Sequence, residues 1–349
     1  MASPVPSVSV VVPMHNAELW IDDCLQSVLT QKFAGKLELS IYNDASTDRS
    51  LEIVERWRTR LQDAGICLSL GGHDSGEPKG VGFAKNCAVY QSCGEYICFL
   101  DADDIMHPNR VQLQLEAAQK HQGALIGSKF SRLPPKSTER YTRWCNSLSC
   151  KQLLTQRFTS FGPTIIQPTW FCHRSVFDAA GPFAEGGKGV PEDLIFFHKH
   201  LQLGNDVHRV DKRLLFYRYH PSAMTFSVNR QTIWDIQVKE FEKSVLCHWP
   251  SFTIWNAGKQ GRHFYKSLTE ENRQKVIMFC DVDSKKISKG CYTFENAPGF
   301  PKPRIPIVHF KCATPPFAIC VKWDLTHGVF EMNLASMNLE EGKDYYHLS

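Results

Sequence analysis

The sequence predicts an α/β fold: an open, parallel-rich sheet with helices on both faces, followed by a small second α/β unit. Short β-branched apolar runs alternate with segments of helical period from Val8 to Gly127. Such runs are typical of parallel strands that helices cover on both faces. A new strand–helix–strand pattern begins after Pro250. We therefore expect two domains, residues 1–250 and residues 251–349.

The first half of the chain carries the clearest alternation. Val8–Val12 is a β-branched run that ends at Pro13, which has no N–H group for a ladder hydrogen bond. Apolar residues then recur at helical spacing from Trp20 to Leu29. Strands are expected at Val8–Val12, Leu37–Tyr42, Cys67–Leu70 and Tyr96–Leu100, with helices near residues 20–29, 46–61, 83–91 and 108–118.

The pattern is weaker from Ser128 onward and recovers near residue 169. It indicates strands at 169–173 and 214–219 and helices at 192–203 and about 232–248. The second unit is expected to contain strands at 252–257, 276–281, 305–310 and 318–321 and a helix at 261–268. Ligands of open parallel sheets bind at the carboxyl ends of the strands. The polar motifs after Val12, Tyr42 and Leu100 therefore mark the expected site.

Composition excludes a disordered chain and leaves the partner open. Hydrophobic residues make up 42% of the 349 residues, which is enough for a packed core. The formal net charge of +4 comes from 40 basic and 36 acidic residues, and it neither requires nor excludes a nucleic acid. The 13 cysteines form no C-x-x-C pair. Reduced core thiols are therefore expected, rather than disulfides or a zinc site.

The N-terminal residues Met1–Ser7 carry no basic segment. The apolar run that follows is far too short for a signal peptide or a membrane anchor. Together with the free cysteines, this predicts a protein of the cytoplasm or nucleus that does not enter a membrane.

Three carboxylates follow the fourth predicted strand within one short turn: Asp101, Asp103 and Asp104. Like charges at this spacing repel one another unless a cation or solvent compensates them. At the carboxyl end of a strand they suit a hard divalent cation that also binds a diphosphate. The alternative is a solvated acidic turn, and the apolar strand before the motif favours the metal site.

Other polar residues near strand ends are candidates for the same site. Asp44 follows the second strand, where its carboxylate can bind a uracil N–H or a ribose hydroxyl, or cap the next helix. Glu192 and Asp193 open a helix after a glycine-rich loop, where they can act on a substrate or serve only as caps. His220 lies just past a strand, and it is a metal ligand only if the carboxylates lie nearby.

Four segments together resemble the family-2 glycosyltransferases of the GT-A fold. They are Val8–Gln31, Asn43–Ser50, Asp101–Asp104 and Glu192-Asp193, and the resemblance covers roughly Val8 to His248. It implies that Asp101 and Asp103 are the D-x-D pair at the metal, with Asp101 shared with the ribose. It also implies that His220 completes the metal site.

The resemblance implies roles for the remaining residues. The nucleoside would be held by Pro13, His15, Asn16 and Asp44, and the base and phosphate would lie near Lys85 and Asn86. Asp193 would be the catalytic base, with Glu192 next in line. The implied activity is inverting transfer from a UDP-sugar to an acceptor hydroxyl, with Mn²⁺ or Mg²⁺ as cofactor.

A closer resemblance, to one member of this family, extends over the whole chain and is compatible with two acceptors. One is queuosine in tRNA, which would receive galactose from UDP-galactose. The other is a glycan, which would receive β-1,3-linked GlcNAc from UDP-GlcNAc. The missing secretory anchor favours the tRNA acceptor. A catalytically dead nucleotide- or RNA-binding protein is the rival class, and the retained Asp103 and Asp193 argue against it.

The second unit resembles half of a dinucleotide-binding fold. Trp255–Gly261 follows one expected strand and Asp281–Asp283 ends the next, but the full G-x-G-x-x-G is missing, so a nucleotide role is only weakly indicated. The basic residues here are Lys285, Lys286, Lys289, Lys302 and Arg304. They can contact tRNA phosphates or form an ordinary solvated lysine face; the tRNA contact is the hypothesis.

Overall fold

The computed structural model describes residues 7–159 and 161–348. The chain divides into two compact units: unit 1 is Met1–Leu153 with Pro163–Asn229, and unit 2 is Leu154–Gly162 with Arg230–Ser349. The helix that precedes Pro250 packs with unit 2: Trp234 Nε1 donates to Ser267 Oγ at 2.8 Å. The contact-based boundary therefore lies at Arg230 rather than at Pro250, and unit 2 also includes Leu154–Gly162 from within the expected first domain.

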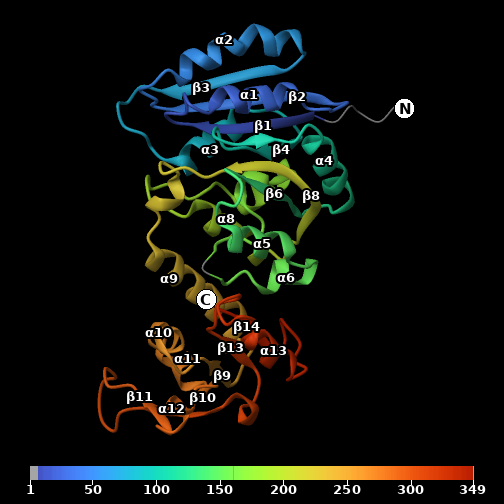
Figure 1. Cartoon of the computed structure of the whole chain (residues 1–349). Coiled ribbons are helices and arrows are strands. Elements are labelled where there is room, and N and C mark those ends of the chain that lie inside the picture. Colours follow the sequence, from blue (N-terminus) through green and yellow to red (C-terminus); the bar gives the residue numbers. More distant parts are fainter. Residues whose placement is uncertain (1–6, 160, 349) are drawn as a thin grey trace. The chain divides into compact units, whose positions relative to one another are not determined.

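Unit 1 is built on one mixed sheet, whose strand order is β3-β2-β1-β4-β7-β6-β8-β5 (Figure 1). Its strands are β1 (Ser7–Met14), β2 (Lys36–Asp44), β3 (Cys67–His73), β4 (Tyr96–Phe99), β5 (Ile105–Met106), β6 (Leu125–Leu133), β7 (Phe171–His173) and β8 (Val207–Arg218). The predicted GT-A-type class is confirmed: a parallel-rich sheet with helices on both faces.

The first four strands are parallel and end at one edge. Strand β1 pairs with β2 and β4, and β2 pairs with β3, all in parallel. In this register Met14 lies opposite Asn43, and Asp44 lies opposite His73. Strand β7 then runs antiparallel to β4. The polar segments that follow β1, β2 and β4 therefore meet at the same edge of the sheet.

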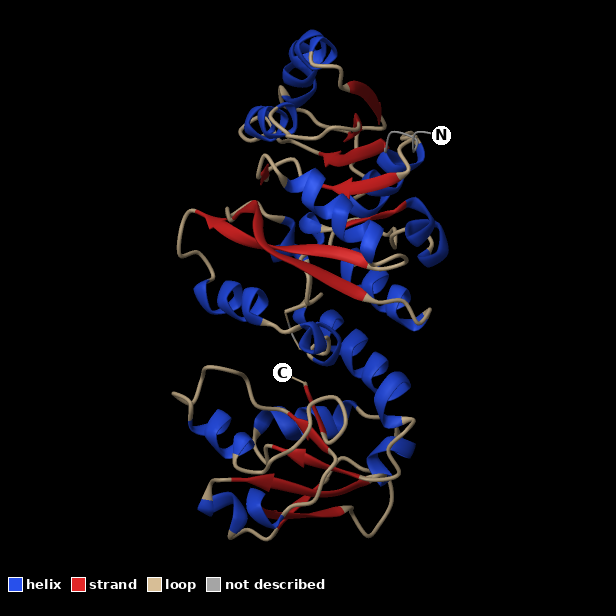
Figure 2. Ribbon diagram, turned by 90° about the vertical axis from the view of Figure 1, so that its right-hand side faces the viewer, coloured by secondary structure: helices blue, strands red, loops and turns tan. Residues whose placement is uncertain are grey.

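The helices of unit 1 cover both faces of this sheet (Figure 2). They are α1 (Ile21–Leu29), α2 (Ser50–Asp63), α3 (Val81–Tyr90), α4 (Arg110–Lys120), α5 (Glu139–Ser147), α6 (Cys150–Thr155), α7 (Arg174–Ala180) and α8 (Glu192–Gln202), with short 3₁₀ turns η1 (Gln167–Thr169) and η2 (Met224–Ser227). Helix α1 buries Ile21, Cys24, Leu25 and Val28, as its apolar period predicts.

Unit 2 has its own six-stranded sheet, in the order β11-β12-β10-β9-β13-β14. Its strands are β9 (Phe252–Trp255), β10 (Val276–Asp281), β11 (Cys291–Thr293), β12 (Arg304–His309), β13 (Phe317–Ile319) and β14 (Tyr345–His347). Its helices are α9 (Arg230–Phe241), the π-helical η3 (Glu242–Leu246), α10 (Lys259–Ser267), α11 (Glu270–Gln274), α12 (Ser284–Ile287), η4 (Phe310–Cys312) and α13 (Val329–Ala335). Only β11 is antiparallel to its neighbour.

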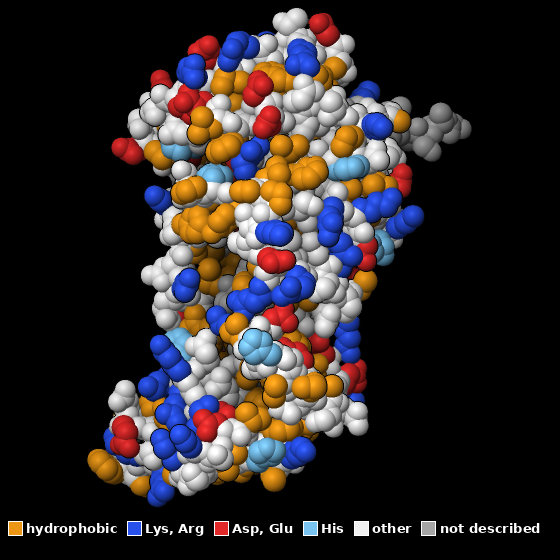
Figure 3. All heavy atoms as spheres, in the orientation of Figure 1, with side chains coloured by type: hydrophobic (Ala, Val, Ile, Leu, Met, Phe, Trp, Pro, Cys, Tyr) orange, Lys and Arg blue, Asp and Glu red, His pale blue; other side chains and the backbone are white. Residues whose placement is uncertain are grey.

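Two apolar clusters lie on the two faces of this sheet. Phe252, Ile254 and Phe264 belong to one, and Trp255 and Phe330 belong to the other. This alternation along β9 is the period of two that a strand covered on both faces shows. On the surface, Lys and Arg side chains gather over the part of unit 2 that carries α10 and α12 (Figure 3).

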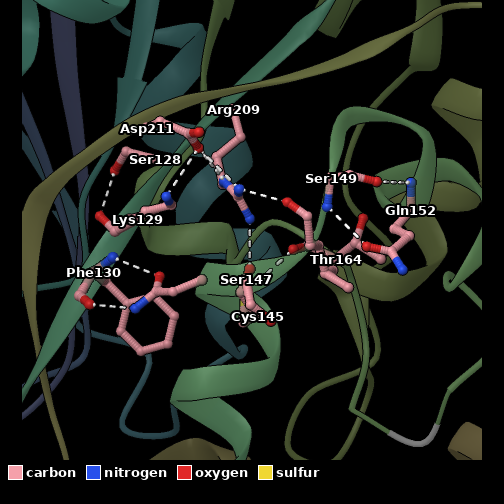
Figure 4. A network of polar contacts seen from close by, with 12 residues as sticks. Ser128, Lys129, Phe130, Cys145, Ser147, Ser149, Gln152, Thr164, Arg209 and Asp211 are labelled. Carbon is pink, nitrogen blue, oxygen red and sulfur yellow. Dashed lines mark hydrogen bonds and ion pairs between the residues drawn. The ribbon is translucent and has the colours of Figure 1, made fainter. Parts of the chain in front are cut away.

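The segment between β6 and β7, where the sequence pattern is weak, is held by polar contacts (Figure 4). The guanidinium of Arg209 donates to Cys145 O at 2.7 Å and to Leu148 O at 2.6 Å. Asn146 exchanges two hydrogen bonds with the backbone of Phe130. Side-chain caps of this kind leave no hydrophobic period, which is why α5, α6 and β6 were not predicted.

The cysteines are free thiols, as expected, but fewer than half of them belong to the core. Those that are buried are Cys24, Cys98, Cys145, Cys172, Cys280 and Cys320, and the other seven are partly or fully exposed. Among the described residues, no helix has both the length and the apolar character needed to span a bilayer.

Candidate active site

Asp101, Asp103 and Asp104 lie in the turn after β4, and they offer carboxylate oxygens that are all within 4.8 Å of one another. Asp101 Oδ1 and Asp104 Oδ2 are buried and have no hydrogen-bond partner in the described part of the chain. Orphaned anionic oxygens this close together are costly without a cation. The donor set is all oxygen, which is what Mg²⁺ and Mn²⁺ prefer. The residues present therefore fit a divalent metal ion.

His220 lies beside this cluster. Its Nε2 is 2.7 Å from Asp103 Oδ2. The ring is packed against Trp20, with centroids 5.2 Å apart. Arg218 lies over the same indole at 4.5 Å and donates from Nε to Asp103 O at 2.7 Å. Trp20 and Arg218 thus fix the imidazole and the acidic turn together, and neither was identified from the sequence as a site residue.

Asp104 is fully buried beneath the cluster. Its Oδ1 accepts the backbone N–H of Arg218 at 2.8 Å, which ties β8 to the acidic turn. Burial, reinforced by the charges of Asp103 and Asp101, raises the pKa of Asp104 well above its ordinary value. Arg110, also fully buried, donates to Phe99 O at 2.7 Å just before the turn. These two buried residues shape the acidic turn from below.

Lys85 joins the acidic cluster to the start of α8. Its Nζ donates to Glu192 Oε1 and to Gln167 Oε1, both at 2.8 Å, and lies 4.0 Å from Asp101 Oδ1. Burial alone would lower the pKa of Lys85, but the carboxylates of Glu192 and Asp101 outweigh it and raise that pKa. The ammonium is therefore charged and shared between carboxylates that the sequence places far apart.

Asp101 and Asp193 have pKa values close to neutrality. Burial raises the pKa of Asp101 to about 6 against the opposing charge of Lys85. Burial, with the neighbouring charge of Glu192, raises the pKa of Asp193 to about 7. Asp193 lies in the first turn of α8 and accepts the Leu194 N–H at 2.7 Å. A carboxylate with a pKa near 7 is suited to general base catalysis.

The predicted nucleoside residues lie together at the ends of β1 and β2, but the buried Asp44 is already engaged. Its carboxylate accepts N–H groups of Lys79 and Gly80 and contacts His73 Nε2, all within 2.9 Å. His15 Nδ1 lies 2.7 Å from Asp44 O. Asp44 therefore holds the β3–α3 loop in place.

The other two nucleoside candidates at the end of β1 differ in their contacts. Asn16 has a φ of 48° and accepts the Thr47 N–H with its side chain at 2.8 Å. Pro13, paired in register with Tyr42, is partly exposed at the same edge. Asn16 therefore ties the β1 end to the turn after β2, and Pro13 borders that junction.

Asn86, on α3, also has protein partners, and they lie on the loop before α8. It donates from Nδ2 to Phe183 O and Glu185 Oε1 and accepts the Phe183 N–H. The glycines of this region serve close packing: a Cβ on Gly82 would lie 2.3 Å from Ala184 O. Asn86 and Gly82 thus bring the loop that carries Glu192 against α3.

Comparison with known proteins also points to a glycosyltransferase domain. Residues 9–181 match the family model described as Glycosyl transferase family 2. This segment of the chain therefore matches a family 2 glycosyltransferase domain. The uncharacterized glycosyltransferase EpsJ of Bacillus subtilis is 27% identical over 229 residues, which are 63% of each chain. The match thus spans less than two thirds of that relative.

Solved structures show the same fold. TarS of Staphylococcus aureus in complex with UDP-GlcNAc superimposes with a TM-score of 0.54 at 20% identity, over 76% of this chain and 71% of that chain. The mannosyltransferase PcManGT of Pyrobaculum calidifontis, in complex with GDP-Man and Mn²⁺, gives a TM-score of 0.53 at 16% identity, over 70% and 65%. Unit 1 shares the GT-A fold of both.

Proposed function

We propose that this chain is an inverting, metal-dependent glycosyltransferase that moves a sugar from a UDP-sugar to an acceptor hydroxyl. The observation that carries the proposal is the bridge made by Lys85. Its ammonium binds Glu192 at 2.8 Å and lies 4.0 Å from Asp101. The acidic cluster and the start of α8, where Asp193 lies, therefore belong to one polar network at the edge where ligands of such sheets bind.

Asp101 and Asp103, with His220, would hold Mn²⁺ or Mg²⁺, and Asp104 lies close enough to take part. When bound, such an ion supplies charge neutralisation for the departing UDP. The nucleoside would lie against Pro13, His15, Asn16 and Asp44 at the ends of β1 and β2. Because the Asp44 carboxylate accepts two N–H groups of the β3–α3 loop, it would act on the nucleoside by holding that loop beside it.

Asp193 would remove the proton from the acceptor hydroxyl as the hydroxyl attacks the anomeric carbon. A pKa raised by burial to about 7 keeps this carboxylate basic enough for the task. Attack opposite the departing UDP inverts the anomeric centre. Glu192 is held by Lys85 and is therefore better placed to steady the start of α8 than to act as the base.

For the acceptor we favour queuosine in tRNA, with UDP-galactose as donor. The support comes from unit 2, where α10 lines an open hollow of about 590 Å³. The residues around it are Lys259, Gln260, Arg262, His263 and Lys266. A basic hollow of this kind suits the phosphates of an RNA backbone. Loop nucleosides of tRNA can be splayed out and recognised individually, as a catalytic pocket requires.

The second candidate is transfer of GlcNAc from UDP-GlcNAc to a glycan. It is favoured by the poly(ribitol-phosphate) β-N-acetylglucosaminyltransferase TarS of Staphylococcus aureus, which is 36% identical over 100 residues, or 28% of this chain and 16% of that protein. The network around Lys85 argues against a catalytically dead scaffold. Its buried ammonium binds Glu192 and lies near Asp101, and it thereby holds the carboxylates of the proposed active site together.

The test is a donor and acceptor screen. Purified protein with MnCl₂ is incubated with UDP-galactose, UDP-GlcNAc or UDP-glucose and with queuosine-containing tRNA, the same tRNA lacking queuosine, or free glycans. Mass spectrometry of the acceptor gives the answer. We expect a hexose added only to queuosine-containing tRNA and only from UDP-galactose. Transfer of GlcNAc to a glycan selects the second candidate. Absence of both transfer and metal-dependent UDP-sugar hydrolysis overturns the enzyme proposal.

A further inference from the structure

Unit 2 has the strand arrangement of a nucleotide-binding sheet. Strands β12, β10, β9, β13 and β14 are adjacent in that order and all parallel. Numbered along the chain, this is the order 3-2-1-4-5. The direction of winding reverses between β9 and β13, and ligands of such sheets bind outside the carboxyl ends of the strands at this switch point.

The turn from β9 into α10 has the spacing of a phosphate-binding turn, with asparagine in place of the first glycine: Asn256, Gly258 and Gly261. Asn256 adopts a φ of 130°, a conformation that favours glycine. A Cβ on Gly261 would lie 1.8 Å from Asn256 O, so the close approach of helix to strand requires glycine. The backbone of the turn therefore follows the motif. The Asn256 carboxamide accepts the Gly258 N–H and donates to Cys320 O, both at 2.7 Å.

The remaining chemistry of such a site is present on β10 and α12. Asp281 ends β10 about 20 residues after Gly261, the position of the acidic residue that binds a ribose in these folds. Its Oδ2 accepts from the Ala257 N–H and from Lys286 Nζ, both at 2.9 Å, and its Oδ1 accepts from the N–H groups of Val282 and Asp283. A ribose hydroxyl would therefore have to replace one of these contacts. Lys286 Nζ also lies 3.3 Å from where a Cβ of Gly258 would be. The Lys286 ammonium and the N-terminus of α10 are both positive, so an anion that binds between them would be stabilised by both.

His347, near the carboxyl end of β14, is a buried polar group with unused hydrogen-bonding capacity. It lies on β14 in register with Ile319 of β13, which is itself in register with Trp255 of β9. The ring is fully buried, and neither nitrogen has a hydrogen-bond partner among the described residues. The ring packs against Trp323, in the loop that follows β13, with centroids 4.4 Å apart, and it also contacts Phe330 and Tyr345.

An unpartnered buried imidazole is costly for the folded protein. Burial lowers the pKa of His347 to about 3, so the ring is neutral and keeps one donor and one acceptor unused. Leaving such groups unpaired costs on the order of 1–3 kcal/mol each. Buried unpaired groups of this kind are few in native proteins, and a bound water or ion is one explanation for them. The helix turn, Asp281 and His347 therefore converge on one edge of the sheet.

We propose that unit 2 contains a second nucleotide site, between the carboxyl ends of β9 and β13, that takes a nucleoside diphosphate. The phosphates would lie at the N-terminus of α10 beside Lys286, and the ribose hydroxyls would face Asp281. This site is independent of the donor site of unit 1 and does not require the proposed transferase activity. A nucleotide there would be an effector or a second substrate of the protein.

The experiment is isothermal titration calorimetry of the full chain with ADP, in the presence of saturating UDP and MnCl₂ to fill the unit 1 site. We expect one ADP site per chain that UDP does not displace. Lys286→Gln is expected to weaken ADP at least about tenfold, the size of one charged hydrogen bond. The matched control Lys289→Gln removes an exposed lysine three positions along the chain and should leave ADP affinity unchanged. 2′-Deoxy-ADP should bind more weakly than ADP because it lacks one hydroxyl for Asp281.

The overturning results are equally specific. Failure of wild-type protein to bind ADP at millimolar concentration removes the site whatever the variants do, so a poorly folded variant does not obscure the test. Competition between ADP and UDP, together with an ADP affinity that Lys286→Gln leaves unchanged, places the nucleotide in unit 1 instead. Equal losses in Lys286→Gln and Lys289→Gln indicate a diffuse basic surface. If ADP does not bind and tRNA does, and if both lysine variants weaken tRNA binding, the surface belongs to RNA phosphates and the nucleotide site is ruled out.

Discussion

His220 Nε2 lies 2.7 Å from Asp103 Oδ2, although the two residues are 117 positions apart in the chain. The contact joins the end of β8 to the turn after β4. Arg218, at the end of β8, reinforces this junction by donating to Asp103 O. A histidine and a carboxylate that already meet can both turn toward a cation with little rearrangement. The arrangement therefore supports a metal site whose ligands are assembled before the metal arrives.

The first prediction concerns the metal. MnCl₂ at 100 times its dissociation constant should stabilise the folded protein by about 2.7 kcal/mol, because the ion binds only the folded state. Asp103→Asn should abolish this gain and the transferase activity, whereas Asp63→Asn, on the exposed end of α2, should retain both. Thermal unfolding with and without MnCl₂ measures the effect. An unchanged manganese response in Asp103→Asn would remove Asp103 from the ligands.

The second prediction concerns the base. Asp193→Asn preserves the shape of the side chain and removes its basicity, so turnover should fall on the order of 10²–10⁴-fold. UDP affinity should stay within about twofold of wild type, since Asp193 lies on α8 and not among the residues at the ends of β1 and β2. Steady-state kinetics and UDP titration provide the two measurements. A loss below tenfold would reassign the base, with Glu192 tested next by Glu192→Gln.

The pH dependence of the rate follows from the same carboxylate. Burial raises the pKa of Asp193 to about 7, and the base must be deprotonated to accept a proton. The rate kcat/KM should therefore rise as pH increases from 5.5 to 8, with a midpoint near 7. The measurement is initial rate against pH at saturating MnCl₂. A profile flat across this range would show that the titration of Asp193 does not limit the reaction.

Lys85 supplies a prediction about stability. Its side chain and that of Glu192 are both largely buried, and removing one partner leaves a buried charge. Lys85→Met should lower the free energy of unfolding by about 3–5 kcal/mol. The double variant Lys85→Met/Glu192→Gln should recover part of this loss, because the orphaned charge is gone. Urea denaturation of both variants decides the matter; equal stability of single and double variants would mean that the pair is not coupled.

Asp104 gives a pH-dependent stability prediction. Its pKa is raised in the folded state by burial, so the folded protein binds this proton more tightly than the unfolded chain does. The stabilisation from the protonated group is therefore present below the unfolded pKa and is lost as pH rises through the folded pKa. In EDTA, Asp104→Asn should raise the melting temperature relative to wild type more at pH 8 than at pH 4. An equal effect at both pH values would contradict the assignment.

Local pattern was enough to predict much of unit 1. The β-branched run at Val8–Val12, the alternation with helices up to Gly127 and the carboxylates after Leu100 all depend on near neighbours in the chain. The structure agrees with these because parallel strands and their crossover helices are specified by apolar period. The segment around α5 and α6 was missed because contacts such as Arg209 to Cys145 O determine it, and they leave no period in the sequence.

Short motifs and their order were sufficient to predict the class of fold, the acidic turn and the resemblance to family 2 glycosyltransferases. The fold was needed to show which groups meet: Arg218 with Asp103, Lys85 with Glu192, and Asp44 with the backbone of Gly80. It also showed that the turn at Asn256 has the geometry that a missing glycine had seemed to exclude. The physical reason is that pairing and burial of charge depend on distance in space, which a linear pattern does not contain.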